Sequence, residues 1–229
     1  MVGMYTTEKP ADLSMRPTQE TYDGLQRAYE FYNRTLFDDR LPNCLITLQR
    51  KGRTYGYFCD RRFVNSKGAQ SDEIAMNPHY FHKRTLGETL STLVHEMVHL
   101  WQYRFAKPGR GRYHNRQWAE KMKSIGLHPS NTGEMGGREL GDQMSHYIIE
   151  GGKFDRVTAE LCKADFTIEW RDDFSEIEGF AELRNRKSPA APKAGKRVKY
   201  SCPRCGLNAW ARHEARLMCG VDRIVLEAS

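Results

Sequence analysis

The chain has 229 residues, of which 39% are hydrophobic and 11% aromatic, and 36 Lys and Arg against 29 Asp and Glu give a net charge of +7. This length accommodates one sizeable domain with a small appendage, and the apolar fraction excludes a wholly disordered chain. No stretch approaches the ~18 consecutive apolar residues of a membrane span, and the first residues lack the apolar core of a secretory signal, so we expect a soluble, cytoplasmic protein.

The apolar patterns predict helices and short strands in an α+β order. A first amphipathic helix is predicted over residues 21–37. Three strands are then predicted at LITLQR, TYGYFC and EIAMN (residues 45–50, 54–59 and 73–77). Two helices follow, at 86–105 and 115–125, and then an apolar YII segment, a helix at 156–163 and a strand at FTIEW (166–170). We therefore expect a helical core with a small antiparallel sheet.

The longest predicted helix contains the motif LVHEMVHL at residues 93–100. His95 and His99 lie about one helical turn apart, so both can place an imidazole nitrogen on one zinc ion. Glu96 points beside that metal, where it can take a proton from a zinc-bound water. The alternative is a helix with two histidines and no metal. A polar His-Glu pair inside a buried apolar helix is costly without a ligand, which favours zinc.

A catalytic zinc site needs a third protein ligand and one open position. His114, fifteen residues beyond His99, and Glu120, twenty-one beyond it, are both candidates for this ligand. His146 is a further histidine that could line the cleft and contact substrate. Tyr147 and Arg138 are candidates for stabilising an oxyanion.

Several segments, in this order, resemble the SprT-like metalloprotease family, which includes the Spartan proteases: AYEFYNRTLFDDRLP, TYGYF, EIAMNP, TLVHEMVHLWQ and YHNRQWAEKMKSIGL, with a C-terminal CPRCG. The resemblance covers residues 22–154 and the C-terminal motif. It implies a zincin-like core in which His95, His99 and His114 hold zinc and Glu96 is the general base, so it prefers His114 to Glu120. It also implies proteolysis linked to DNA, including the repair of DNA–protein crosslinks.

The last 28 residues contain three of the six cysteines, and they predict a second zinc site. Cys202 and Cys205 form a C-P-x-C-G turn that lets two thiolates face one metal. Cys219 lacks the partner cysteine of a second such turn. Either Asp222 or His213 would then supply the fourth ligand, or the site is degraded and no longer holds zinc tightly. A module this small has too few apolar residues to fold without an additional cross-link such as a bound metal ion, which favours bound zinc.

The positive charge is concentrated in two segments. Residues 103–123 carry seven basic residues and one acidic residue, and residues 184–199 carry seven basic residues and none that is acidic. The rest of the chain then holds 22 basic and 28 acidic residues and is net acidic. Basic clusters with nearby aromatic rings are typical of nucleic-acid contacts. The residues expected to bind nucleic acid are Arg110, Arg112, Arg116, Lys196, Arg197, Lys199 and Trp210.

These patterns predict four parts: a flexible N-terminus (1–19), a SprT-like metalloprotease domain (20–183), a basic linker (184–199) and a zinc-ribbon-like module (200–229). We expect a zinc-dependent endopeptidase that acts on DNA-associated or DNA-crosslinked proteins, with DNA, single-stranded DNA included, as a partner near the nucleoid. The alternative is a non-catalytic DNA-binding zinc protein. Glu96 favours the enzyme, because a purely structural zinc site has no use for a base at that position.

Overall fold

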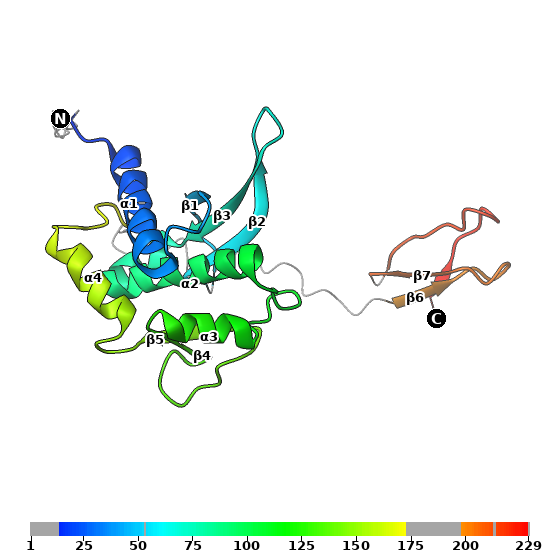
Figure 1. Ribbon diagram of the computed structural model, residues 1–229. Helices are drawn as coiled ribbons and strands as arrows, with labels where there is room; N and C mark the ends of the chain where they lie inside the picture. Colours follow the sequence, from blue (N-terminus) through cyan, green and yellow to red (C-terminus); the bar gives the residue numbers. More distant parts are fainter. Residues whose placement is uncertain (1–13, 53, 173–197, 213, 229) are drawn as a thin grey trace, which may run out of the picture. The chain divides into compact units, whose positions relative to one another are not determined.

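The computed structural model describes residues 14–52, 54–172, 198–212 and 214–228, and it confirms a mixed α+β fold (Figure 1). The chain divides into two compact units, Met1–Asp173 and Phe174–Ser229. Most of the predicted basic linker, residues 184–197, lies outside the described residues. Among the described residues, no helix has both the length and the apolar character that crossing a membrane requires.

Helix α1, Pro17–Phe37, begins with a proline at its first turn and ends at Asp38, which adopts a left-handed conformation. It starts four residues earlier than predicted, so its first turn overlaps the segment expected to be a flexible N-terminus. One face is buried in the core, and the apolar residues it contributes are Leu25, Ala28, Tyr29, Tyr32, Leu36 and Phe37.

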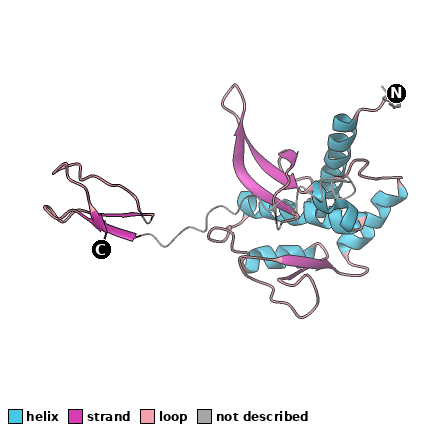
Figure 2. Ribbon diagram, turned by 180° about the vertical axis from the view of Figure 1, so that it is seen from behind, coloured by secondary structure: helices cyan, strands magenta, loops and turns pink. Residues whose placement is uncertain are grey.

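Strands β1 (Leu45–Leu48), β2 (Gly56–Val64) and β3 (Gln70–Met76) form one sheet in the order β1-β3-β2. The β2–β3 pair is antiparallel, as expected, whereas β1 joins β3 in parallel, so the sheet is mixed. A register shift between Cys59 and Phe63 marks a bulge in β2. The tip of the β2–β3 hairpin projects away from the helices in both views (Figure 1 and Figure 2).

Helix α2, Leu86–Phe105, follows the short helix η1, Pro78–Lys83, and has the predicted bounds. The Thr85 side chain accepts from the Glu88 backbone N–H, and the Glu88 carboxylate accepts from the Thr85 N–H, which forms a capping box. The helix lies between the sheet and the following helix (Figure 1). It is buried over most of its length and supplies the centre of the core with Leu90, Leu93, Val94, Met97 and Leu100.

Helix α3 (Arg116–Ser124), strands β4 (Leu127–Ser130) and β5 (Ser145–Ile148), and helix α4 (Lys153–Lys163) complete the first unit. The two strands pair antiparallel. Gly126 connects α3 to β4 with φ of +91°, and a Cβ there would lie 2.7 Å from the Phe154 nitrogen. Only glycine therefore fits this turn.

The strand predicted at residues 166–170 is wrong, because this segment has no strand partner among the described residues. Its apolar residues pack instead of pairing. Phe166 is buried in the core, and the Trp170 indole N–H donates to the Glu20 carboxylate of α1 at 2.6 Å. The aromatic and β-branched residues of this segment pack against a helix. An alternating apolar pattern in the sequence does not by itself distinguish such a packed segment from a strand.

The second unit is a small antiparallel sheet with the order β7-β6-β8, built from β6 (Val198–Ser201), β7 (Asn208–Ala211) and β8 (Glu227–Ala228). Strand β6 begins two residues before the predicted boundary at residue 200. The buried cluster of this unit consists of Tyr200, Cys202, Cys219 and Leu226. So few apolar side chains indicate that the unit needs another source of stability.

Candidate metal centres

Three imidazoles converge at the middle of the first unit. Helix α2 contributes His95 and His99, and the loop before α3 contributes His114, and their ligand atoms all lie within 4.8 Å of one another. The Nε2 atoms of His99 and His114 are 3.0 Å apart. His95 and His114 are buried, and His99 is half-buried. Buried imidazole nitrogens that face one another in this way are suited to share a metal ion.

His114 is positioned by a loop that is distant in the sequence. Its backbone N–H donates to the Gly141 carbonyl at 2.8 Å, and Gly141 N–H donates back to the His114 carbonyl at 3.3 Å. The Gly141 carbonyl also accepts from the ring at Nδ1, at 3.0 Å. Because Nδ1 carries that proton, Nε2 of the neutral ring is free to face the cluster. Glu120, the other candidate for third ligand, is exposed on α3 and is paired with Arg116 at 2.8 Å.

Trp118 forms a common packing surface for the three imidazoles. Its ring centroid lies 4.9 Å from that of His95, 5.5 Å from that of His99 and 4.4 Å from that of His114. The indole is fully buried, and the Asn115 side chain caps helix α3 by accepting from the backbone N–H of Trp118 at 3.1 Å. Trp118 therefore belongs to the core and also packs against all three candidate ligands.

Burial favours the neutral form of these histidines. It lowers the pKa of His99 to about 3 and the pKa of His95 well below its ordinary value, with nearby imidazoles adding to both effects. Burial also lowers the pKa of His114. Neutral imidazole is the form that binds a metal, because protonation occupies the lone pair that would be donated.

Glu96 lies between His95 and His99 in the sequence of α2, and its side chain packs against strand β2. It is only 6% exposed, and burial raises the pKa of its carboxyl to about 8, opposed by a hydrogen bond from the Phe58 backbone. The close approach of β2 to α2 depends on Gly56, where a Cβ would lie 3.0 Å from Thr92 Cγ2 and 3.4 Å from Glu96 Cγ. A carboxyl whose pKa lies near neutral pH can both accept and release a proton under physiological conditions.

His146 of β5 also reaches this site, against the ring of His95. The two Nδ1 atoms are 3.1 Å apart, and His146 Nε2 lies 2.8 Å from Ser91 Oγ. The sequence suggested that His146 could line the cleft and contact substrate, and the structure places its ring against the candidate metal ligand His95. The ring of Tyr147 is stacked on that of His128, with the ring centroids 4.8 Å apart. The backbone N–H of Arg138 donates to Asn131 Oδ1. No contact among the described residues links Tyr147 or Arg138 to the three imidazoles.

The second unit brings together the three cysteines and Asp222. The ligand atoms of Cys202, Cys205, Cys219 and Asp222 lie within 4.8 Å of one another. Asp222 Oδ2 lies 3.3 Å from Cys202 Sγ and 3.6 Å from Cys219 Sγ, and the Sγ atoms of Cys205 and Cys219 are 3.6 Å apart. His213, the other candidate for fourth ligand, lies outside the described residues.

Two turns of this cluster have the same local geometry. In the first, the Cys205 backbone N–H lies 3.5 Å from Cys202 Sγ; in the second, the Asp222 N–H lies 3.4 Å from Cys219 Sγ. Asp222 therefore occupies the place that the second cysteine of a C-x-x-C turn would take. Hydrogen bonds from the thiols, that of Cys205 first, lower the pKa of the Asp222 carboxyl. A divalent cation could replace those thiol protons.

The expected nucleic-acid contacts occupy two surfaces. Arg110 and Arg112 lie in the loop that precedes His114, and both are exposed, whereas Arg116 pairs with Glu120. On the second unit, Lys199 of β6 lies opposite Trp210 of β7, which is 60% exposed. Lys196 and Arg197 lie outside the described residues.

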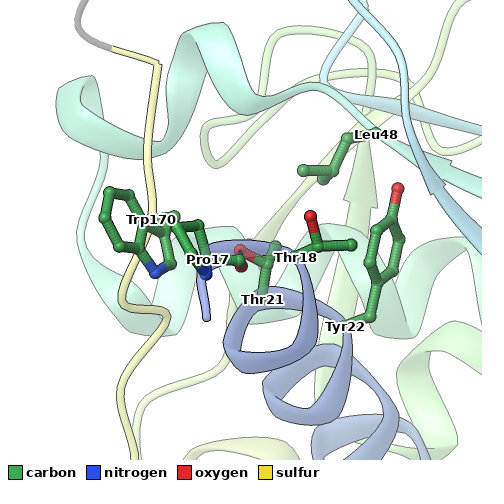
Figure 3. A pocket seen from close by; sticks show the side chains of 6 residues that line it. All are labelled: Pro17, Thr18, Thr21, Tyr22, Leu48 and Trp170. Carbon is green, nitrogen blue, oxygen red and sulfur yellow. Dashed lines mark hydrogen bonds between the residues drawn. The ribbon is translucent and has the colours of Figure 1, made fainter. Parts of the chain in front are cut away.

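A shallow hollow of about 290 Å³ lies elsewhere on the first unit (Figure 3). The start of α1, strand β1 and the indole of Trp170 line it, with Thr18, Tyr22 and Leu48 among the contributing side chains. None of the predicted metal ligands or basic residues lines it, so we assign it no role in the candidate chemistry.

Comparison with known proteins agrees with this geometry. A model of the SprT-like family matches residues 25–135, a span that includes all three converging histidines and Glu96. An uncharacterized protein from Salmonella typhimurium, described as lying in the mucB 3' region, is 61% identical over 59 residues, which is 25% of this chain and 80% of that protein. No solved structure matches the chain. The chain belongs to the SprT-like family.

Proposed function

We propose that this protein is a zinc-dependent endopeptidase whose centre is formed by His95, His99 and His114, with Glu96 as general base. Membership of the SprT-like family supports a metalloprotease-like function. The observation that carries the proposal is the convergence of three neutral imidazoles beside a buried carboxyl of raised pKa.

The donor set fits zinc. Zinc accepts imidazole nitrogen, and catalytic sites combine three protein ligands with an open fourth position. Here three histidines from two segments converge, and burial keeps their rings in the unprotonated form that coordination requires. The hydrogen bond from His114 Nδ1 to the Gly141 carbonyl further directs that ring's Nε2 toward the other two histidines.

Zinc, when bound, supplies Lewis acidity that activates water and polarises a peptide carbonyl. The proton of this water is then transferred by a residue of the chain. Glu96 accepts it at a carboxylate oxygen and can deliver it to the leaving amine, which the raised pKa of this carboxyl favours. The Phe58 backbone of β2 partly opposes the rise in the pKa of this carboxyl.

The first test replaces the base without changing its size. Glu96→Gln should leave zinc content unchanged and abolish cleavage of a DNA-bound test protein, because the amide cannot accept the proton. Glu120→Gln is the matched control, since Glu120 is exposed and paired with Arg116 on the surface of α3. Cleavage that persists in Glu96→Gln with full zinc content would overturn the assignment of Glu96 as general base. Absence of cleavage by the unaltered, zinc-loaded protein would favour the non-catalytic DNA-binding alternative.

We further propose that the substrates are proteins associated with or crosslinked to DNA. Support comes from Arg110 and Arg112, which lie just before a candidate ligand, and from the Lys199–Trp210 pair on the second unit. Guanidinium groups bind phosphates and release counterions, while an exposed indole can stack on a base. The test is the slope of log K against log salt concentration for single-stranded DNA.

The double variant Arg110→Gln/Arg112→Gln should lower the magnitude of that slope by about 1.4, because each arginine that neutralises a phosphate of single-stranded DNA contributes about 0.7. The double variant Arg27→Gln/Arg34→Gln of helix α1 removes the same charge and serves as control. An equal change of slope in both variants would show that net charge alone is responsible, and would remove the Arg110 loop from the DNA contact surface.

The cysteine cluster is proposed as a second, structural zinc site formed by Cys202, Cys205, Cys219 and Asp222. The matching geometry of its two turns and the small core of this unit support it. Two zinc ions per chain are expected in the purified protein. A content of one zinc ion per chain would exclude either the cysteine site or the histidine site.

A further inference from the structure

A chain of hydrogen bonds leads from the backbone of α2 through Ser91 and His146 to His95. The Ser91 hydroxyl donates to the Glu88 carbonyl at 2.8 Å. His146 Nε2 lies 2.8 Å from the same hydroxyl oxygen, and His146 Nδ1 lies 3.1 Å from His95 Nδ1. Ser91 is buried on α2, and pairing of β5 with β4, with His146 opposite Pro129, holds His146 in place.

The direction of every bond in this chain follows from the number of protons available. A serine hydroxyl has one proton, and that of Ser91 is given to the Glu88 carbonyl, so its oxygen can only accept from His146. His146 therefore carries its proton on Nε2, and its Nδ1 is an acceptor. The partner of that acceptor, His95 Nδ1, must then be the donor.

This assignment leaves the Nε2 lone pair of His95 available for a metal. His114 is arranged in the same way, since its Nδ1 proton goes to the Gly141 carbonyl. Histidines that bind a metal commonly donate their second N–H to a fixed acceptor, which sets the tautomer and the ring orientation. For His95 that acceptor is another imidazole in place of the usual carboxylate or carbonyl.

We propose that His146 is a positioning residue, which holds His95 as the Nδ1–H tautomer with Nε2 directed toward the metal. The proposal rests on the proposed function insofar as His95 is a zinc ligand. Without His146, the His95 ring would lose its fixed acceptor and could protonate Nε2 instead of Nδ1. That tautomer cannot bind zinc through Nε2, so zinc affinity would fall.

The first experiment measures zinc affinity of the histidine site in the full chain. Chelator-buffered zinc is titrated while the imidazole resonances of His95 and His99 are followed by NMR, which distinguishes this site from the cysteine cluster. His146→Leu should weaken binding by roughly 10- to 100-fold, the effect typical of removing the partner of a ligating histidine. His146→Asn should recover part of that affinity, because its side-chain oxygen can accept from His95 Nδ1.

The matched control is His128→Leu on the neighbouring strand β4. His128 stacks on Tyr147, and no contact among the described residues joins it to His95. Its variant should bind zinc as the unaltered protein does. Unchanged affinity in His146→Leu, or equally weakened binding in the His146→Leu and His146→Asn variants, would overturn the positioning role.

The second experiment needs neither zinc nor a variant. Long-range ¹H–¹⁵N spectra of the metal-free protein identify which ring nitrogen of each histidine carries the proton. Protons on His95 Nδ1 and His146 Nε2 are expected, and a proton on His95 Nε2 would overturn the proposal. A protein that shows the expected tautomers but binds no zinc at the histidines would instead contradict the proposed function, so the two failures are distinguishable.

Discussion

His114 Nδ1 lies 3.0 Å from the carbonyl oxygen of Gly141, and the backbones of the two residues also pair. The loop between β4 and β5 thus holds the third candidate ligand in place from outside the helix that carries the first two. The position of this candidate ligand consequently depends on a contact between segments far apart in the chain.

His114→Ala should remove one zinc ion per chain and abolish cleavage, because two histidines do not complete a catalytic site. Glu120→Ala should retain zinc and activity, since an exposed ion pair contributes little. Metal analysis together with a cleavage assay checks both variants. Loss of zinc in Glu120→Ala with retention in His114→Ala would reverse the assignment.

Gly56→Ala should destabilise the protein by about 1–3 kcal/mol and lower activity. The added Cβ would lie 2.8 Å from the Ala75 carbonyl and 3.0 Å from Thr92 Cγ2, which forces β2 away from α2 and Glu96. Gly87→Ala in α2 is the control, because a Cβ there meets nothing within 4 Å and helix propensity improves. Urea denaturation compares the two, and equal stability would contradict the close-packing argument.

Asp222→Cys should hold the second zinc ion against a chelator more strongly than the unaltered protein, and Asp222→Ala more weakly. The reason is that thiolate is a softer ligand than carboxylate and suits zinc in a closed structural site. Zinc content after dialysis against increasing chelator gives the order. Glu227→Ala, an exposed carboxylate on β8, should match the unaltered protein. Equal zinc retention in Asp222→Ala would exclude Asp222 as a ligand.

The free energy of unfolding should fall as pH rises above about 9. Burial raises the pKa of Cys44 to about 12 and also raises that of Tyr29, whose hydroxyl donates to the Pro42 carbonyl. The folded protein therefore keeps protons that the unfolded chain releases. The stabilisation is complete at pH values below the pKa of these groups in the unfolded chain, and it is lost as the pH rises through their pKa in the folded protein. Each group contributes up to about 1.4 kcal/mol per pH unit.

Denaturant unfolding between pH 8 and pH 11 measures this slope. Cys44→Ala should make the slope shallower, because one of the proton-retaining groups is removed. Cys162→Ala should leave it unchanged, since Cys162 is exposed. A slope that is the same in Cys44→Ala as in the unaltered protein would show that the Cys44 thiol does not contribute.

The sequence alone was sufficient for the features that local interactions control. The bounds of α2 were predicted correctly, because its apolar pattern, the Thr85–Glu88 capping box and the proline beyond its end act within a few residues. The spacing of His95 and His99 follows from one helical turn, and the turn at Cys202–Cys205 is equally local. The family resemblance added a preference for His114 and was confirmed at the level of the family.

Tertiary contacts decided the rest. Spacing left both His114 and Glu120 open, and the Gly141 contact places His114 at the cluster while Glu120 remains exposed. Three further features likewise depend on segments distant in sequence. They are the parallel pairing of β1 with β3, the packing of residues 166–170 without a strand partner in the described part of the chain, and the contact of His146 with His95. Packing between such segments, and the hydrogen-bond partner available to each buried group, is decided only when the chain has folded.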